Sequence, residues 1–188
     1  MSKAYKNFRS LNTDEAVVAG ILRDETTKDI EIFMPMNAQM KDVDLVARNM
    51  KNKESITIQV KWSRAYEPKI SERKNFWDWS AWWFFFSKDI IARSEADYFI
   101  FLIYVIEQED VMGRRAIRPH TLAIPTIDLK EIVKKYKNES DGDRYSFIFW
   151  IDPKKKLAWD IRNKKNMYPV SDYLDKKWFE KMNNFLSQ

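Results

Sequence analysis

The sequence predicts an α/β fold in which a central mixed β-sheet is flanked by helices within a single domain. Residues 42–64 alternate apolar and polar side chains with the period of two that is typical of β-strands. Residues 97–105 form an almost unbroken apolar run, which indicates a strand buried on both faces. Other segments, such as residues 12–24, repeat their apolar side chains at the three- and four-residue spacing of a helix. A chain of 188 residues is long enough for one domain with a sizeable core.

The first expected elements are a helix and a strand. Residues 12–24 are predicted to form a helix, because their apolar side chains recur on one face at intervals of three and four. Asn12 can cap this helix, and Glu15 at the third helical position would complete a capping box. Glu15 can equally point inward towards a functional site, and the sequence leaves both interpretations open. Residues 30–34 follow as the first strand.

Residues 42–64 are predicted to form an antiparallel hairpin around a polar turn. Pairing about its midpoint places Asp44 beside Gln59 or Val60, with Cβ atoms of neighbours about 4.5–5.5 Å apart. Gln59 and Lys61 lie two residues apart on the second strand, so they share its polar face. A carboxylate, an amide oxygen and an ammonium group are therefore expected to converge, as in a metal-dependent phosphodiester site.

This pattern resembles the PD-(D/E)xK nuclease superfamily, which includes restriction enzymes, Holliday junction resolvases and some transposition endonucleases. The resemblance depends on Asp44, followed fifteen residues later by Gln59, Val60 and Lys61, and it covers roughly residues 12–62. The chain has Gln59 where Asp or Glu is usual, a variant also found in active members, and no proline directly precedes Asp44. The resemblance implies a restriction-endonuclease-like core with the element order αβββαβ.

The resemblance also implies a divalent-metal-dependent endonuclease that hydrolyses phosphodiester bonds in DNA. Asp44, Gln59 and the backbone carbonyl of Val60 would hold Mg²⁺, for which Mn²⁺ can substitute. Lys61 would orient the attacking water or help to deprotonate it. Glu15 would supply a second carboxylate, as in superfamily members that have an acidic residue on the first helix. The predicted catalytic residues are thus Asp44, Gln59, Lys61 and Glu15.

The remaining elements complete one domain of residues 1–188, with residues 12–106 as the core and 107–188 as a basic, aromatic-rich extension. We expect a helix over 76–96, whose aromatic face either packs in the core, stacks on bases or forms a dimer interface. The later elements are predicted as a strand over 121–125, a helix over 127–136, a strand over 145–151 and a closing helix over 171–186.

The C-terminal region has the composition of a nucleic-acid contact. From Trp150 onward it holds eight Lys and one Arg against four Asp and one Glu. Two basic clusters flank Trp159, and they are expected to contact DNA phosphates: Lys154, Lys155 and Lys156, and then Arg162, Lys164 and Lys165. A solvated hairpin face is the alternative.

Several classes of protein are disfavoured by composition. The chain has no cysteine, three glycines and one histidine, His120, which we expect in a loop. Thiolate metal sites, phosphate-cradling glycine loops and Ser-His-Asp hydrolysis are thereby disfavoured, and no organic cofactor is expected. No segment is apolar and long enough for a signal core or a membrane span, so we expect a cytoplasmic location. A homodimer is expected, because cutting a duplex requires two active sites. The alternative function is an inactive nuclease fold that binds nucleic acid or protein.

Overall fold

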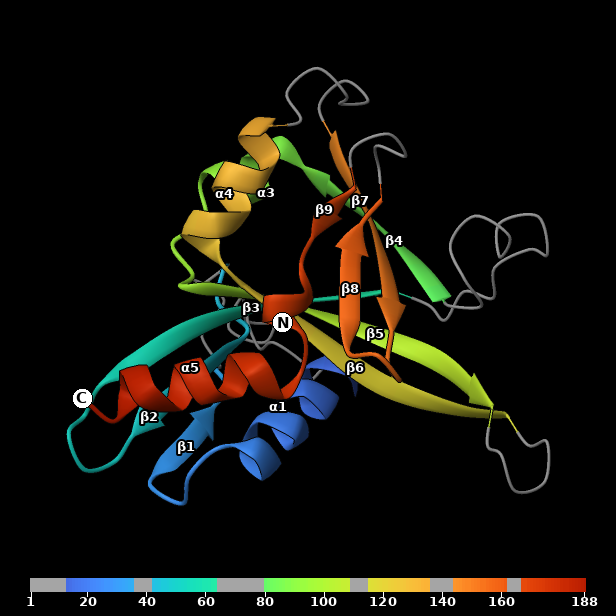
Figure 1. The fold of residues 1–188 in the computed structure, drawn as a ribbon. Helices are drawn as coiled ribbons and strands as arrows, with labels where there is room; N and C mark the ends of the chain where they lie inside the picture. Colours follow the sequence, from blue (N-terminus) through green and yellow to red (C-terminus); the bar gives the residue numbers. More distant parts are fainter. Residues whose placement is uncertain (1–12, 36–41, 64–79, 109–114, 136–143, 162–166) are drawn as a thin grey trace, which may run out of the picture.

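Two β-sheets and the helices around them form a mixed α/β structure (Figure 1). The first sheet has five strands in the order β1-β2-β3-β5-β6, and the second has four in the order β4-β7-β8-β9. The computed structural model describes residues 13–35, 42–63, 80–108, 115–135, 144–161 and 167–188.

The five-stranded sheet is mixed, as the sequence predicts. β3 and β5 run parallel, and every other neighbouring pair in this sheet is antiparallel. β5 lies between β3 and β6, so it is an interior strand. The strands are β1 (Ile30–Phe33), β2 (Leu45–Asn49), β3 (Ser55–Ser63), β5 (Tyr98–Gln108) and β6 (Arg115–Pro125).

The four-stranded sheet is antiparallel throughout. Its first strand, β4, comes from the connection between β3 and β5, and the other three follow α4 in the chain. The two sheets are therefore interleaved along the sequence. The strands of this sheet are β4 (Ser80–Ser87), β7 (Arg144–Asp152), β8 (Leu157–Asp160) and β9 (Tyr168–Pro169).

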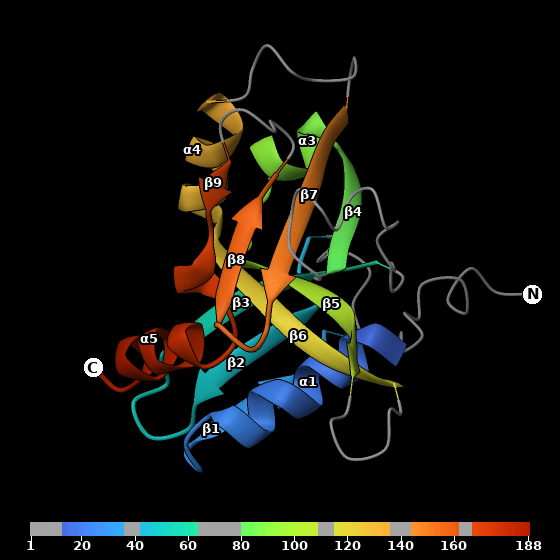
Figure 2. The same cartoon turned by 45° about the vertical axis from the view of Figure 1, so that its right-hand side comes forward.

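The helices lie on both sides of the five-stranded sheet. α1 and α5 cover one face, whereas α3, α4 and the second sheet lie on the other (Figures 1 and 2). In the described part of the chain, no helix is long and apolar enough to cross a membrane. The helices are α1 (Thr13–Glu25), α3 (Lys88–Ala92), α4 (Thr126–Lys135) and α5 (Lys176–Leu186), with a 3₁₀ turn, η3 (Ser171–Tyr173), before α5.

β5 separates two apolar cores, because its successive side chains point to opposite faces. Phe99, Phe101 and Ile103 pack with Phe147 and other residues of β7 and α4. On the other face, Ile100 and Leu102 belong to the core formed with α1 and α5. All five β5 side chains are fully buried, which confirms the predicted strand with two buried faces.

The predicted helix over residues 76–96 is wrong. The described part of this segment forms β4, which pairs with β7 along its whole length, and then the short helix α3. Bulky aromatic residues favour extended backbone, where their side chains pack across neighbouring strands. The partner strand β7 lies more than fifty residues further along the chain, so local spacing could not reveal it.

Other boundaries differ more modestly. α1, β1, α4 and β7 agree with the predicted elements to within about one residue at each end, and the capping position Asn12 lies outside the described residues. The strand predicted over 121–125 is the second half of the longer β6. The division predicted after residue 106 falls inside β5. The closing helix begins at Lys176 instead of Ser171, whose hydroxyl bonds both backbone polar groups of Ala158.

Asn49, at the end of β2, links the hairpin to the C-terminus of α5 by a hydrogen bond. Its buried amide donates to the carbonyl of Leu186 at 2.7 Å, and its Oδ1 accepts the backbone N–H of Lys51 at 2.8 Å. We expect Asn49→Ala to lower the free energy of unfolding by about 1–3 kcal/mol, because buried polar groups lose their partners. Urea denaturation measures this change.

Asn52 provides the matched control, because its exposed side chain donates to the same Leu186 carbonyl at 2.8 Å. Asn52→Ala should cost less than Asn49→Ala, since water replaces an exposed donor. Equal losses from the two variants would contradict the assigned role of Asn49.

Candidate functional site

The β2–β3 hairpin has the register that the sequence predicts. Leu45 lies opposite Ile58, and Ala47 lies opposite Ile56. Asp44 directly precedes β2, and its backbone N–H and its carboxylate bond Ile58 and Val60, so it lies beside the part of β3 that contains Gln59. The hairpin therefore brings together two of the predicted site residues.

The Asp44 carboxylate lies against the edge of β3. Its Oδ2 accepts the backbone N–H of Val60 at 2.7 Å, and its own N–H donates to the carbonyl of Ile58 at 2.8 Å. Asp44 is 4% exposed. The N–H and C=O of one strand residue point towards the same neighbour, so the Val60 carbonyl is directed to the edge that Asp44 occupies. A carboxylate and a carbonyl oxygen thus share this edge.

Gln59 and Lys61 project from the face of β3 that carries neither Ile58 nor Val60, because side chains alternate along a strand. Gln59 is 5% exposed, and Lys61 is half-buried. The side-chain oxygen of Gln59 is buried and has no hydrogen-bond partner among the described residues. Leaving such an acceptor unsatisfied costs about 1–3 kcal/mol, so a cation or a water at this oxygen would stabilise the structure.

Glu15 reaches the sheet from its other face. α1 packs through Val18 and Leu22 onto the core that contains Ile58 and Val60. Glu15 is buried at 8% exposure, at the start of α1. It therefore does not share the strand face of Gln59. Glu15 and Gln59 thus lie on opposite faces of β3, and Asp44 lies at the strand edge.

The start of α1 is tied to the end of β5. The Tyr104 hydroxyl donates to Oδ1 of Asp14 at 2.8 Å, in the residue beside Glu15. Burial, together with this hydrogen bond, raises the pKa of Tyr104 to about 12. Tyr104 consequently remains a donor throughout the ordinary pH range and holds the first turn of α1 in place.

The donor set fits a hard cation in part. Mg²⁺ prefers oxygen ligands, and Asp44, Gln59 and the Val60 carbonyl offer a carboxylate, an amide and a backbone oxygen. The buried, unsatisfied Gln59 oxygen is the observation that favours a cation here. Nowhere in the described ranges do three His, Cys, Asp or Glu side chains gather as a metal group. Among these three ligands, only Asp44 would bring a negative charge to a cation bound at this edge.

The predicted basic surface is only partly described. Lys154, Lys155 and Lys156 form the turn between β7 and β8 and are exposed. Asp152 orders this turn by accepting the Lys155 N–H at 2.9 Å, and Lys156 has a positive φ of 54°. The second cluster, which comprises Arg162, Lys164 and Lys165, lies outside the described residues.

Comparison of the chain with protein-family models, with curated proteins and with solved structures finds no match.

One arrangement is missed by the sequence reasoning. His120, expected in a loop, lies in β6, and its Nδ1 is 2.8 Å from Oδ2 of Asp175. The two residues are 55 positions apart, and they meet because Leu174 forms a β-bridge with Leu122. The only available signal is the spacing of Arg118 and His120, which places both on one face of a strand.

Proposed function

We propose that this protein is a divalent-metal-dependent endonuclease that hydrolyses phosphodiester bonds in DNA and has a restriction-endonuclease-like core. The single observation that supports this proposal is the Asp44 carboxylate bound to the Val60 N–H at the edge of β3, beside Gln59, whose side-chain oxygen is buried without a partner among the described residues. The order of α1, β1, β2, β3 and β5 also agrees with such a core, with β4 and α3 placed before β5.

The chemistry assigns a separate task to each group. Asp44, Gln59 and the Val60 carbonyl would hold Mg²⁺, which stabilises phosphate charge and lowers the pKa of a bound water. Lys61 shares the Gln59 face of β3, so its ammonium can position the attacking water or neutralise charge that develops on the phosphate. Glu15 lies on the other face of the sheet, and it would supply a second negative charge to the site across the strand edge.

The test is a cleavage assay on supercoiled, linear and branched DNA in Mg²⁺, Mn²⁺ or EDTA. We expect the wild-type protein to cut at least one substrate when a metal is present and none in EDTA. Lys61→Ala should slow cleavage while leaving Mn²⁺ binding largely intact, because Lys61 is not a metal ligand. A folded wild-type protein that cuts none of the three DNA forms would refute the proposed activity.

Gln59→Glu is expected to raise the affinity of the site for Mn²⁺. An added carboxylate at a buried oxygen position strengthens the binding of a hard cation, and we expect about a tenfold gain, or roughly 1.4 kcal/mol. Isothermal titration calorimetry with Mn²⁺ measures the change, and Glu54→Gln on the exposed turn is a control that should have no effect. Weaker Mn²⁺ binding by Gln59→Glu would argue against a cation at this position.

A second candidate function is nucleic-acid or protein binding without cleavage. The observation that favours it is the lack of a group of three His, Cys, Asp or Glu side chains among the residues that the structure covers. In this alternative, Asp44 has a structural role at the β3 edge. DNA binding that persists in EDTA, together with no cleavage in any metal, would support the alternative.

We predict that the turn between β7 and β8 contacts DNA phosphates. Each phosphate contact contributes about 0.9 to the slope of log affinity against log salt on duplex DNA. Replacing Lys154, Lys155 and Lys156 together with Gln should therefore flatten the slope by about 0.9 per lost contact. Fluorescence anisotropy at several salt concentrations measures it. The control makes the same charge change at three other exposed lysines, Lys51, Lys134 and Lys181. Equal salt-dependence slopes for the two triple variants would show that this turn does not contact DNA phosphates.

A further inference from the structure

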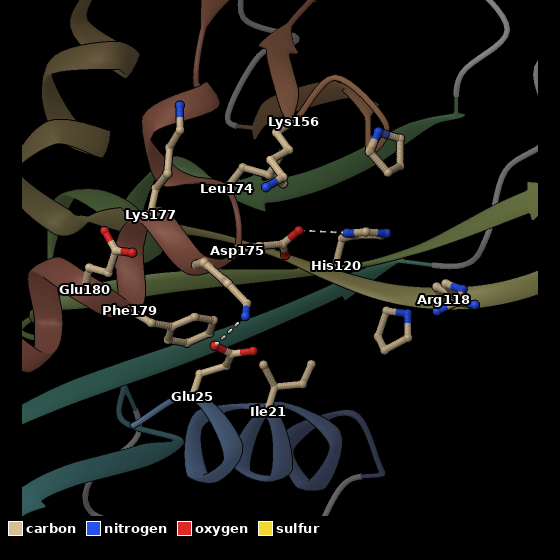
Figure 3. Close-up of a pocket in the computed structure, with 13 residues that line it drawn as sticks. Ile21, Glu25, Arg118, His120, Lys156, Leu174, Asp175, Lys177, Phe179 and Glu180 are labelled. Carbon is tan, nitrogen blue, oxygen red and sulfur yellow. Dashed lines mark hydrogen bonds and ion pairs between the residues drawn. The ribbon is translucent and has the colours of Figure 1, made fainter. Parts of the chain in front are cut away.

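A cleft of about 740 Å³ lies between α1, β6, the β7–β8 turn and the start of α5 (Figure 3). β6 is an edge strand of the five-stranded sheet, at the end of the strand order that is remote from β1. None of the predicted catalytic residues lines this cleft. Any ligand bound here would therefore occupy a site separate from the edge of β3.

Asp175 and His120 form a fixed pair within the cleft. Asp175 Oδ1 accepts the Thr121 N–H at 2.8 Å, while Oδ2 lies 2.8 Å from Nδ1 of His120. The Asp175 N–H donates in turn to the Thr121 carbonyl at 2.9 Å, and the residue has a positive φ of 45°. This backbone conformation is uncommon for a residue with a side chain. The carboxylate is thus held in one orientation, and Nε2 of His120 points away from it (Figure 3).

The lining is most basic around His120. Arg118 and His120 lie two residues apart on β6 and therefore share one strand face. Lys156 extends over the cleft from the β7–β8 turn, and its ammonium group lies above Asp175 and beside Leu174 (Figure 3). Two cationic side chains and one protonatable side chain thus line the part of the cleft formed by β6 and the β7–β8 turn, where a doubly charged anion would be favoured.

The carboxylates of the lining do not cancel this charge. Glu25 pairs with Lys176 at 3.9 Å, and Asp175 is paired with His120. Glu180 lies at the other end of the cleft, on the side of Phe179 (Figure 3). Lys177 also lines the α5 side, so the charges of that side are balanced, whereas Arg118 and Lys156 leave a positive charge on the side of β6 and the β7–β8 turn.

Apolar side chains form the remaining wall. Ile21 of α1, Leu174 and Phe179 line the cleft between its two ends. A volume of about 740 Å³ lies within the range of small-molecule sites, which are usually mostly apolar with a few fixed polar groups. The combination suits a ligand with an anionic head and an apolar or aromatic body.

We propose that this cleft binds a phosphate monoester attached to a nucleoside-sized group. Arg118, Lys156 and His120 contact the phosphate, and the organic group lies against Ile21 and Phe179. The ligand is either a free nucleoside monophosphate or the 5′-phosphorylated end of a nucleic acid. This proposal does not depend on cleavage at the β3 edge, because none of its residues belongs to that site.

The test uses the full chain and four probes: AMP, adenosine, inorganic phosphate and a short single-stranded DNA with or without a 5′-phosphate. Isothermal titration calorimetry gives the affinities, and thermal unfolding checks that each variant is folded. Lys156→Gln and Arg118→Gln should each weaken AMP binding about tenfold or more, since each removes a charge-assisted contact. Lys28→Gln makes the same charge change at an exposed lysine that lies outside both the cleft and the β7–β8 turn, so AMP binding should be unchanged.

The probes distinguish the two sources of phosphate. Binding of AMP that adenosine does not share identifies a free nucleotide ligand. Binding of only the 5′-phosphorylated DNA, lost in Lys156→Gln, identifies a nucleic-acid end. The proposal is overturned if neither AMP nor inorganic phosphate nor the phosphorylated end binds. It is also overturned if Arg118→Gln, which lies in the cleft but outside the β7–β8 turn, weakens binding of DNA with and without the 5′-phosphate equally, because that result would indicate an internal backbone contact.

Discussion

Asp44→Asn abolishes metal-dependent DNA cleavage while leaving the fold intact: this is the largest functional effect that we expect. Asparagine keeps an oxygen that can accept the Val60 N–H, which Asp44 now accepts at 2.7 Å. It removes the negative charge at the β3 edge. Loss of a group that stabilises charge at a reacting phosphate costs about 100-fold or more in rate. Nicking of supercoiled DNA in Mg²⁺ and Mn²⁺ measures the effect.

Two further variants separate charge from structure. Asp44→Ala should be equally inactive and also less stable by about 1–3 kcal/mol, because the buried Val60 N–H loses its acceptor. Asp24→Asn removes a charge from an exposed position on α1 and should leave cleavage unchanged. Cleavage by Asp44→Asn at the wild-type rate would show that the carboxylate has no catalytic part, and the binding function would then be favoured.

Phe101→Ala produces the largest expected loss of stability. Phe101 is 0% exposed in the core between the two sheets. Its ring lies 4.9 Å from that of Phe149 and 5.9 Å from that of Phe147, measured between centroids. Truncating a buried phenylalanine costs about 3–5 kcal/mol, which combines lost burial with the cavity that remains. For a chain of this length we expect the melting temperature to fall by roughly 6–20 °C.

The matched control for this prediction is Phe185→Ala. Phe185 lies on α5 with 49% of its surface exposed, so its truncation should change the free energy of unfolding by about 0.5 kcal/mol or less. Calorimetry or urea denaturation compares the two variants. A loss below about 1 kcal/mol for Phe101→Ala would mean that the core between the sheets relaxes to fill the cavity.

The hairpin and its register could be predicted because the information is local. Period-two alternation defined β2 and β3, and a polar turn between them fixed which residues face each other. The position of Asp44 beside the part of β3 that contains Gln59 follows from that register. The interior strand β5 was equally clear, since a short, continuously apolar run fits a strand covered on both faces.

The remaining errors concern partners that are distant in the sequence. β4 was predicted as a helix because its aromatic residues also recur at helical spacing, and only pairing with β7 fixes it as a strand. His120 and Asp175 meet through a bridge between Leu122 and Leu174, which no local pattern indicates. The face that α1 covers, and hence the side from which Glu15 approaches, is likewise set by packing alone.

The interleaving of the two sheets has a consequence for how the chain folds. β4 belongs to the second sheet, although it lies in the chain between β3 and β5 of the first sheet. Its partner β7 is synthesised more than fifty residues later. The parallel pair β3–β5 can form early, but the connection between its strands has no sheet to join until β7 emerges. Such non-local pairing slows folding, because loop-closure entropy is lost before the contacts are gained. A nascent chain that ends near residue 106 therefore exposes the apolar face of Phe99 and Phe101 to solvent, and folding is completed only after translation of the second sheet.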